Sequence, residues 1–210
     1  MGPTRQQTSK YQPHSRRGSE PGASSSSSYA GSVKRVLLTG MSGTGKSTLI
    51  RELTVRGYRA IDADSDEWSE WVTVDSDADP FDPIPGPGSV WRNRDWLWSE
   101  DRMRRLLAID DIDLLFVAGT ASNQGKFHQL FDHIVLLTAP ASVLVERLAT
   151  RTSNSYGKHP EELARVLQHL QTVEPLLRRA ATLEIDTTAS VGETLEMILK
   201  AVGPQEGRSG

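Results

Sequence analysis

Apolar and polar positions follow two different patterns along this chain. Short apolar runs lie within residues 33–39, 58–61, 113–118, 133–137 and 183–185. Runs of this length that are apolar on both faces are typical of buried parallel strands. Longer amphipathic stretches separate them, and this alternation predicts an α/β fold in which helices cover both faces of a five-stranded parallel sheet.

The amphipathic stretches predict helices at 46–56, 90–109, 160–180 and 191–202, and a further helix beginning at Pro140. Pro175 is expected to kink the helix in which it lies. Trp68 and Trp71, three positions apart, favour another helix over 65–74. Residues 75–89 carry four prolines and four aspartates, which predicts a loop.

The stretch Gly40-Met-Ser-Gly-Thr-Gly-Lys-Ser-Thr48 follows the first predicted strand and precedes the first helix. It fits the pattern G-x-x-x-x-G-K-[ST] of the phosphate-binding loop, or P-loop. Its glycines allow a tight turn in which successive N–H groups point at phosphate. The predicted phosphate-binding residues are Gly40, Ser42, Gly43, Thr44, Gly45, Lys46, Ser47 and Thr48. Lys46 reaches the β- and γ-phosphates in such loops, and the Ser47 hydroxyl binds Mg²⁺.

The composition of the chain argues against several other classes of protein. The net charge is −3, which does not indicate a nucleic-acid binder. There is no cysteine, so neither disulfides nor a cysteine-ligated zinc are expected. No apolar run approaches the roughly 18 residues of a membrane span, and the N-terminus has no signal-peptide pattern. We therefore expect a soluble, cytoplasmic protein without membrane or nucleic-acid partners.

Two ends of the chain differ in composition from the rest. Residues 1–32 are rich in Ser, Gly and Pro, and residues 203–210 resemble them. Such segments bury too little apolar surface to fold, so both are predicted to be disordered tails around a domain at 33–202. A protein-binding role for the N-terminal tail is an open alternative.

Taken in order, the motifs resemble those of small P-loop kinases, the group of shikimate, gluconate and adenylate kinases. Ile61-Asp-Ala-Asp64 is similar to the D-x-D at the end of the second strand of shikimate kinases. Val143–Arg151, with Arg147 and Arg151 one turn apart, resembles the helix that leads into the lid. Leu183–Thr188 resembles the last strand and the base-contacting loop, which makes Thr188 a candidate nucleotide contact.

The resemblance implies a P-loop fold with strand order 2-3-1-4-5, ATP and Mg²⁺ as cofactors, and a short lid at about 151–160. It assigns Asp62 to a water on the metal and Asp64 to the acceptor hydroxyl. Arg147 would lie against adenine, and Arg151 would contact phosphate. Two simpler interpretations stay open: Asp64 or Ser65 could cap a helix, and the arginines could lie on a solvated helix face and pair with Glu146 or Asp62.

Departures from the pattern limit the assignment of a substrate. Gly119-Thr-Ala stands where shikimate kinases have Gly-Gly-Gly, and the zinc-bearing lid of some adenylate kinases is absent. The segment at about 65–110 is expected to bind the phosphate acceptor. It holds all five tryptophans, namely Trp68, Trp71, Trp91, Trp96 and Trp98, which could form an acceptor wall or a packed subdomain. Arg92, Arg94 and Arg102, with Asn123 and Gln124, are further candidate acceptor contacts.

The sequence thus predicts an ATP-dependent kinase that phosphorylates a small metabolite or nucleotide. Lys46, Asp62, Asp64 and Arg151 are its expected catalytic residues, and Ser47 and Asp62 its metal contacts. A nucleoside monophosphate kinase and a non-catalytic ATP-binding regulatory protein are the alternatives.

Overall fold

The structure is a computed structural model, which describes residues 33–73 and 94–203. The strands are β1 Lys34–Thr39, β2 Arg59–Asp62, β3 Ser69–Thr73, β4 Arg94–Trp98, β5 Leu114–Ala118, β6 His133–Thr138 and β7 Leu183–Asp186. The helices are α1 Lys46–Val55, α2 Glu100–Leu107, α3 Ala141–Thr150, α4 Pro160–Thr172, α5 Glu174–Ala180 and α6 Val191–Val202, with a 3₁₀-helix η1 at Gln124–Leu130. The predicted tail at 1–32, the predicted loop at 75–89 and nearly all of the predicted tail at 203–210 lie outside the described residues.

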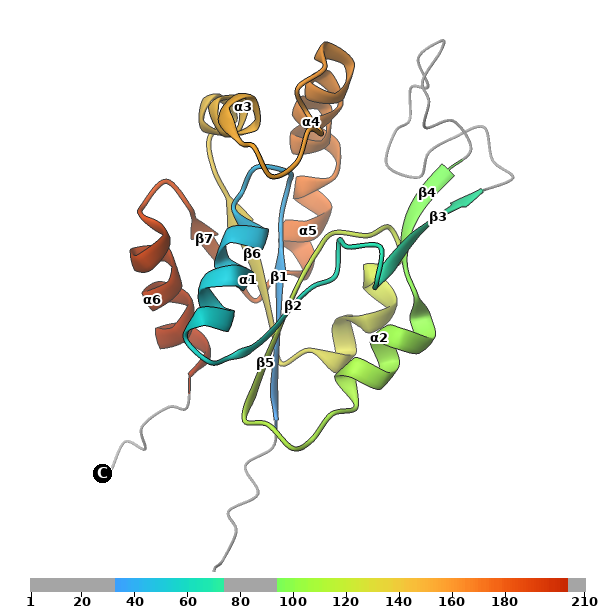
Figure 1. Ribbon diagram of the computed structural model, residues 1–210, viewed down its shortest axis with the longest axis vertical. Coiled ribbons are helices and arrows are strands. Elements are labelled where there is room, and N and C mark those ends of the chain that lie inside the picture. Colours follow the sequence, from blue (N-terminus) through green and yellow to red (C-terminus); the bar gives the residue numbers. More distant parts are fainter. Residues whose placement is uncertain (1–32, 74–93, 204–210) are drawn as a thin grey trace, which may run out of the picture. The chain divides into compact units, whose positions relative to one another are not determined.

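Five of the strands form one parallel sheet in the order β2-β5-β1-β6-β7 (Figure 1). When the five predicted strands are numbered by themselves, this is the predicted order 2-3-1-4-5, so the predicted fold class is confirmed. The central strand β1 is hydrogen-bonded to both β5 and β6. Its last four residues are fully or almost fully buried, as expected for the middle of a covered sheet.

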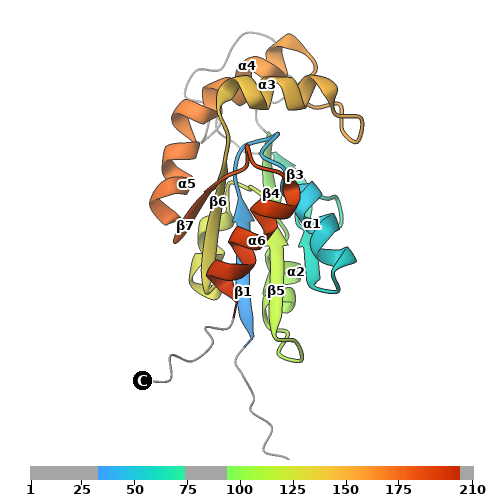
Figure 2. The ribbon, with the colours of Figure 1, turned by 90° about the vertical axis from the view of Figure 1, so that its left-hand side faces the viewer.

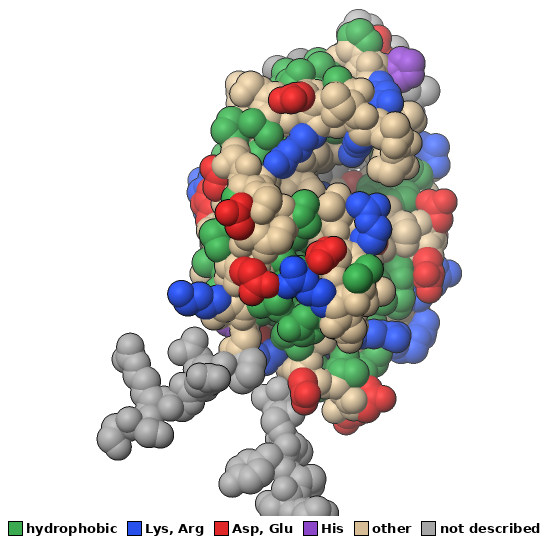
Figure 3. Space-filling model, turned by 60° about the vertical axis from the view of Figure 1, so that its left-hand side comes forward, with side chains coloured by type: hydrophobic (Ala, Val, Ile, Leu, Met, Phe, Trp, Pro, Cys, Tyr) green, Lys and Arg blue, Asp and Glu red, His purple; other side chains and the backbone are tan. Residues whose placement is uncertain are grey.

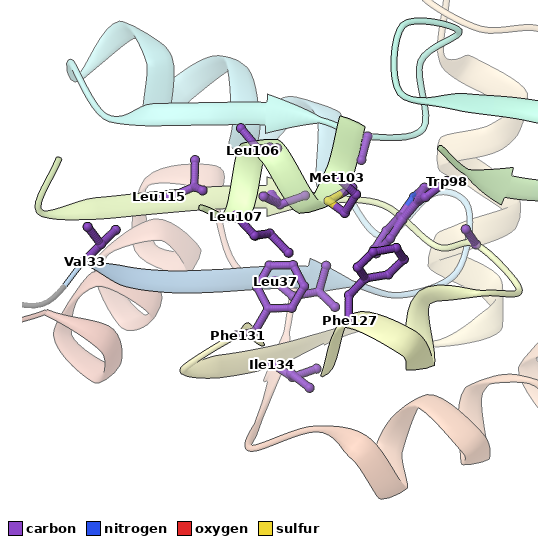
Figure 4. Packing of buried hydrophobic residues seen from close by; sticks show 13 residues of the cluster. Val33, Leu37, Trp98, Met103, Leu106, Leu107, Leu115, Phe127, Phe131 and Ile134 are labelled. Carbon is purple, nitrogen blue, oxygen red and sulfur yellow. The ribbon is translucent and has the colours of Figure 1, made fainter. Parts of the chain in front are cut away.

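Helices cover both faces of the sheet (Figures 1 and 2). Alternate residues of each strand point to opposite faces, so neighbours such as Leu37 and Leu38 belong to different cores. The Leu38 face packs against α1 and α6. The Leu37 face packs against α2 and η1, where the Trp98 and Phe127 rings lie side by side (Figure 4). A third cluster joins α3 and α5 to Leu136 of β6.

The predicted helix at 65–74 is wrong and the predicted helix at 90–109 is partly wrong, because residues 69–73 and 94–98 pair as an antiparallel ribbon. Trp71 stands opposite Trp96, with ring centroids 5.0 Å apart. Aromatic and β-branched residues favour strands, but the two halves of this ribbon lie in separate parts of the chain. Local spacing of Trp68 and Trp71 therefore suggested a helix where a distant partner imposes a strand. Within the described part of the predicted 90–109 helix, residues 94–109, Glu100–Leu107 form the helix α2.

The predicted helix at 160–180 is two helices, α4 and α5, which meet at Val173. The break comes two residues before Pro175, which occupies the first turn of α5. Proline has no N–H to donate and its ring collides with the preceding turn, so it fits a helix start better than a helix interior. The longest described helix, α4, has 13 residues, and no helix in 33–73 or 94–203 is long and apolar enough to cross a membrane.

Candidate functional site

The P-loop joins the carboxyl end of β1 to the amino end of α1, as the sequence predicts. Gly40 opens it with φ 147°, and a Cβ there would lie 2.4 Å from the carbonyl oxygen of Leu137. Only glycine fits so close to β6. Gly45, with φ 96°, directly precedes α1, so the N–H groups of the first helical turn face the loop. This end of a helix favours anions.

A cavity of about 570 Å³ lies over the P-loop, and Figure 3 shows the surface hollowed there with Lys and Arg side chains around it. The loop contributes every residue from Met41 to Thr48. Asp62 and Asp64 line it from the end of β2, Arg147 from α3, and Arg151 from the position directly after α3. Gly40 and Thr188, two of the predicted nucleotide contacts, are not among the lining residues.

Lys46 and Asp64 meet inside this cavity. The Lys46 Nζ atom lies 3.7 Å from Asp64 Oδ2 and donates a hydrogen bond of 2.7 Å to the carbonyl oxygen of Gly40. The other Asp64 oxygen, Oδ1, accepts a 2.8 Å hydrogen bond from the Thr120 backbone N–H. The Asp64 side chain keeps 31% of its surface exposed, so one edge of the carboxylate is open to the cavity.

Burial raises the pKa of the Asp64 carboxyl above its usual range, and the negative charge of Asp62 acts in the same direction. The positive charge of Lys46 and the Thr120 N–H oppose this rise without cancelling it. A carboxylate with a raised pKa accepts a proton more readily, which is the property that a general base needs.

The helix-cap interpretation of Asp64 or Ser65 is wrong, because the next element is the strand β3 and not a helix. Asp62 Oδ1 accepts a 3.2 Å hydrogen bond from the Asp64 N–H, and the chain then turns into β3. This local bond holds the strand end in a turn and leaves both carboxylates at the cavity wall.

The two arginines, Arg147 and Arg151, hold different parts of the cavity. The Arg147 guanidinium donates to the Thr187 hydroxyl at 2.9 Å, to the Thr187 carbonyl oxygen, and to Gly43 at 3.4 Å. It therefore connects the P-loop to the loop after β7. Arg151 donates to the Ser42 hydroxyl at 3.4 Å and to the Tyr156 carbonyl oxygen. These contacts contradict the interpretation of a freely solvated helix face.

The Arg151 guanidinium makes fewer hydrogen bonds than that of Arg147. Its Nε is buried without a hydrogen-bond partner among the described residues, and burial lowers the pKa of its guanidinium. A desolvated cation with an unused donor gains more from an approaching anion than a solvated one does.

Some of the candidate acceptor contacts are buried in the core, and others are exposed. Trp98 is 1% exposed and packs in the core, with Trp68 and Trp96 beside it, whereas Trp71 is 40% exposed. The packed-subdomain interpretation holds for Trp98. Asn123 exchanges hydrogen bonds of 3.0 and 2.9 Å with the Trp98 backbone, and the buried Gln124 accepts one of 3.2 Å from Thr39.

Two of the arginines proposed for the acceptor, Arg94 and Arg102, do not line the P-loop cavity. Arg94 stacks over the Trp71 ring at 5.6 Å, and Arg102 donates to the Glu67 carbonyl oxygen. Trp91 and Arg92 lie outside the described residues.

Sequence reasoning missed several residues of the cavity wall. Thr187, Ala189, Val191 and Thr194 line the end near α6, and Thr150, Ser153 and Asn154 line the end near α3. The resemblance pointed to the loop after β7 but selected Thr188, whose N–H instead donates to Asp186 at 2.7 Å. A shift of one residue reverses the direction of a side chain at a strand end, and the sequence alone did not fix that register.

This sheet order and this loop together define the fold of the small P-loop kinases. Residues 36–168, more than half of the chain, match the family model described as "AAA domain", so the chain belongs to that family.

Solved structures with the same fold include kinases. The shikimate kinase from Acinetobacter baumannii in complex with shikimate has a TM-score of 0.52 at 16% identity, over 84% of this chain and 97% of that one. A gluconokinase from Sinorhizobium meliloti 1021 has a TM-score of 0.50 at 20% identity, over 80% and 91%. At these identities the likeness establishes the fold. No curated protein sequence matches this chain significantly.

Proposed function

We propose that the protein is a cytoplasmic ATP-dependent kinase that transfers the γ-phosphoryl group to a hydroxyl of a small metabolite or nucleotide. The observation that carries this proposal is the pairing of Asp64 with Lys46 in the P-loop cavity, 3.7 Å apart. Nucleotide binding alone needs the lysine. A carboxylate held beside it can orient an acceptor hydroxyl or take its proton, which supports phosphoryl transfer in addition to binding.

Mg²⁺ fits the donors at this site. Ser47 and Asp62 both line the cavity, and they supply a hydroxyl and a carboxylate oxygen. The described residues contain no group of three or more His, Cys, Asp or Glu that could hold a metal. Mg²⁺ needs none, since it keeps several waters and takes the rest of its ligands from substrate phosphates. Bound there, it would neutralise phosphate charge.

We assign each step of the transfer to residues that line the cavity. Lys46 and the P-loop N–H groups would hold the phosphates in line with the acceptor. The acceptor oxygen forms a bond to the γ-phosphorus as the bond to the β,γ-bridging oxygen breaks, and ADP leaves. The acceptor proton passes to the open oxygen of Asp64, whose other oxygen stays fixed by Thr120.

The arginines would complete the site. Arg147 lies between Gly43 and Thr187, where a guanidinium plane can face the base of the nucleotide. Arg151, with its unused Nε, would meet the negative charge that is transferred.

The test is a screen of purified protein for acceptor-dependent ADP release from MgATP. The panel holds nucleotides, sugars, sugar acids and shikimate, the last because the structural neighbour binds it. Lys46→Ala should lose at least a hundred-fold in turnover with any acceptor found and keep its fold. Lys200→Ala, an exposed lysine on α6, is the matched control and should behave as wild type. ATP binding without ADP release on any acceptor would instead identify a nucleotide-binding regulatory protein.

A further inference from the structure

A second cavity, of about 550 Å³, is formed by β2, the turn before β3, and α2 with the residues that follow it. We call it the α2 groove. It shares no lining residue with the P-loop cavity. Arg59 begins β2 and Ile109 lies between α2 and β5, so the α2 groove extends toward the amino ends of these strands, whereas the P-loop site lies at the carboxyl ends. The proposed phosphoryl transfer makes no use of it.

Three of the residues that line the α2 groove are apolar. Leu106 is buried and belongs to the hydrophobic core, and Trp68 and Ile109 are partly buried against that core. Cavities of about 300–1,000 Å³ with apolar side chains and a few charged groups in their walls are typical of sites for small molecules. The size and the apolar part of the wall therefore fit a small organic molecule better than a hydrated ion.

The remaining wall of the α2 groove is mainly cationic. Arg59 comes from β2, Arg102 and Arg105 come from α2, and Glu67 is the one acidic residue that lines the groove. Arg102 donates a hydrogen bond to the Glu67 backbone carbonyl oxygen, which joins α2 to the turn before β3. Arg59 and Arg105 are exposed and make no hydrogen bond or ion pair with another described residue. Three positive charges that share one hollow with a single negative charge attract an anion.

A ligand that uses the whole wall must combine two kinds of chemistry. An inorganic anion would use the arginines and leave the apolar residues in water, and a neutral apolar molecule would leave the positive charges unpaired. We propose that the α2 groove binds a small organic anion, with an aromatic or aliphatic part against Trp68 and Leu106 and an oxyanion group between Arg59 and Arg105. A guanidinium group can form two parallel hydrogen bonds to a carboxylate or to a phosphate, so either oxyanion fits.

Two probes carry this chemistry, namely 2-naphthoate and 2-naphthyl phosphate. At least one of them should bind with a Kd of about 1 mM or tighter, as expected for a ligand of this size. The tighter of the two identifies the preferred oxyanion. The neutral 2-naphthalenemethanol and the ring-free acetate should each bind at least about ten-fold more weakly, because each lacks one half of the recognised structure.

Arg59→Gln and Arg105→Gln each remove one charge and no contact to a described residue, so both variants should fold normally. Each should weaken binding of the tighter probe about three-fold, and the double variant should weaken it about ten-fold. Arg179→Gln is the matched control, since Arg179 is an exposed arginine on α5 that lines neither cavity. It should bind the probe as the wild type does. Lys46→Ala should do the same, so this site does not depend on the proposed kinase activity.

The experiment is a ¹⁵N NMR titration of the full chain with each probe, with MgADP present to occupy the P-loop. Saturable shifts of the Trp68 indole and of the Arg105 and Leu106 amides, weakened in the two variants and not in Arg179→Gln, support the proposal.

Four results overturn it. The first is no saturable shift at these residues up to about 10 mM of either probe. The second is binding that neither substitution changes. The third is equally tight binding of the alcohol or of acetate, which would mean that only half of the wall is used. The fourth is shifts that appear when the protein alone is concentrated and that vanish in the double variant, which would assign the α2 groove to a second copy of the chain.

Discussion

Asp64 is the residue at which stability and proposed function conflict. The cavity wall buries part of its carboxylate, and this burial raises the pKa of the carboxyl despite the neighbouring Lys46. In the unfolded chain the same group ionises in its ordinary range. The folded protein therefore binds this proton more tightly than the unfolded protein does. The free energy of unfolding falls as the pH rises from the ordinary pKa of an aspartate to the raised pKa of Asp64 in the folded protein.

Asp64→Asn should accordingly raise the melting temperature at pH 8, because the amide avoids the cost of a buried negative charge. The difference from wild type should shrink as the pH falls toward the ordinary range of an aspartate, where both proteins are uncharged at this position. The measurement is thermal unfolding of both proteins between pH 4 and pH 8. Turnover should fall by at least a hundred-fold in the same variant.

Asp66→Asn provides the control, since Asp66 is exposed and does not line the cavity. It should change neither the pH dependence nor the turnover. A melting temperature of Asp64→Asn that lies below wild type at every pH would mean that the Lys46 contact outweighs burial.

Arg147 and Arg151 should differ in the kinetic constant they control. Arg147 is bonded to Thr187 and Gly43 before any ligand arrives, so its contribution to ATP binding is the same in ground and transition states. Arg147→Ala should raise KM for ATP and lower the melting temperature, with kcat nearly unchanged. Arg151→Ala should lower kcat ten-fold or more, since each decade corresponds to about 1.4 kcal/mol of transition-state stabilisation.

Steady-state kinetics of the two alanine variants and the two lysine variants against ATP separates these roles. A lysine should replace Arg147 poorly, because an ammonium cannot form the paired bonds to Thr187. At Arg151 a point charge should recover part of the rate. The reverse pattern, with Arg147 controlling kcat and Arg151 controlling KM, would exchange their assignments.

At the scale of elements, α6 follows directly on the loop that closes one end of the cavity. Ser190 caps this helix: its hydroxyl accepts from the Glu193 N–H, while the Glu193 carboxylate accepts from the Ser190 N–H. This reciprocal pair is a capping box. The helix start fixes where Val191 and Thr194 meet the cavity.

Ser190→Ala should therefore lower the free energy of unfolding by about 0.5–2 kcal/mol, the usual cost of a lost N-cap. Ser99 precedes α2 in the same way but makes no side-chain capping bond, so Ser99→Ala should change stability little. Urea unfolding of the two variants beside wild type measures both values. Equal losses in the two variants would show that the capping box of α6 adds nothing beyond serine's preference for the position.

The helices and strands also show how much of the fold could be predicted from the sequence. The five sheet strands are recognisable because each is a short apolar run, and their order follows from the resemblance. The ribbon is not recognisable, because the partner of Trp71 is Trp96, in a separate stretch of chain. For the cavity, the P-loop and Asp64 carry a local motif, whereas Thr187 is brought there by β7 and has no signature of its own.

At the scale of the molecule, the hydrophobic core of the described residues is formed entirely by residues within 33–202. All three hydrophobic clusters consist of residues between Val33 and Val202. Lys34 donates hydrogen bonds to the carbonyl oxygens of Val202 and Gly203, so the first strand and the last helix are joined at their ends. The described residues, 33–73 and 94–203, all belong to one compact unit.

Deletion of residues 1–30 should accordingly leave the melting temperature within about one degree of the full chain and leave the affinity for MgATP unchanged. The composition of this segment offers too little apolar surface to add stability by burial. Thermal unfolding should be recorded for both proteins with and without MgATP. Ligand at 100 times Kd should add about 2.7 kcal/mol to each, and this increment should be the same if the site is intact. A loss of several degrees without ligand would show that the segment packs on the domain. A smaller increment with an unchanged melting temperature would instead place the segment in nucleotide binding, and would favour a regulatory role for it.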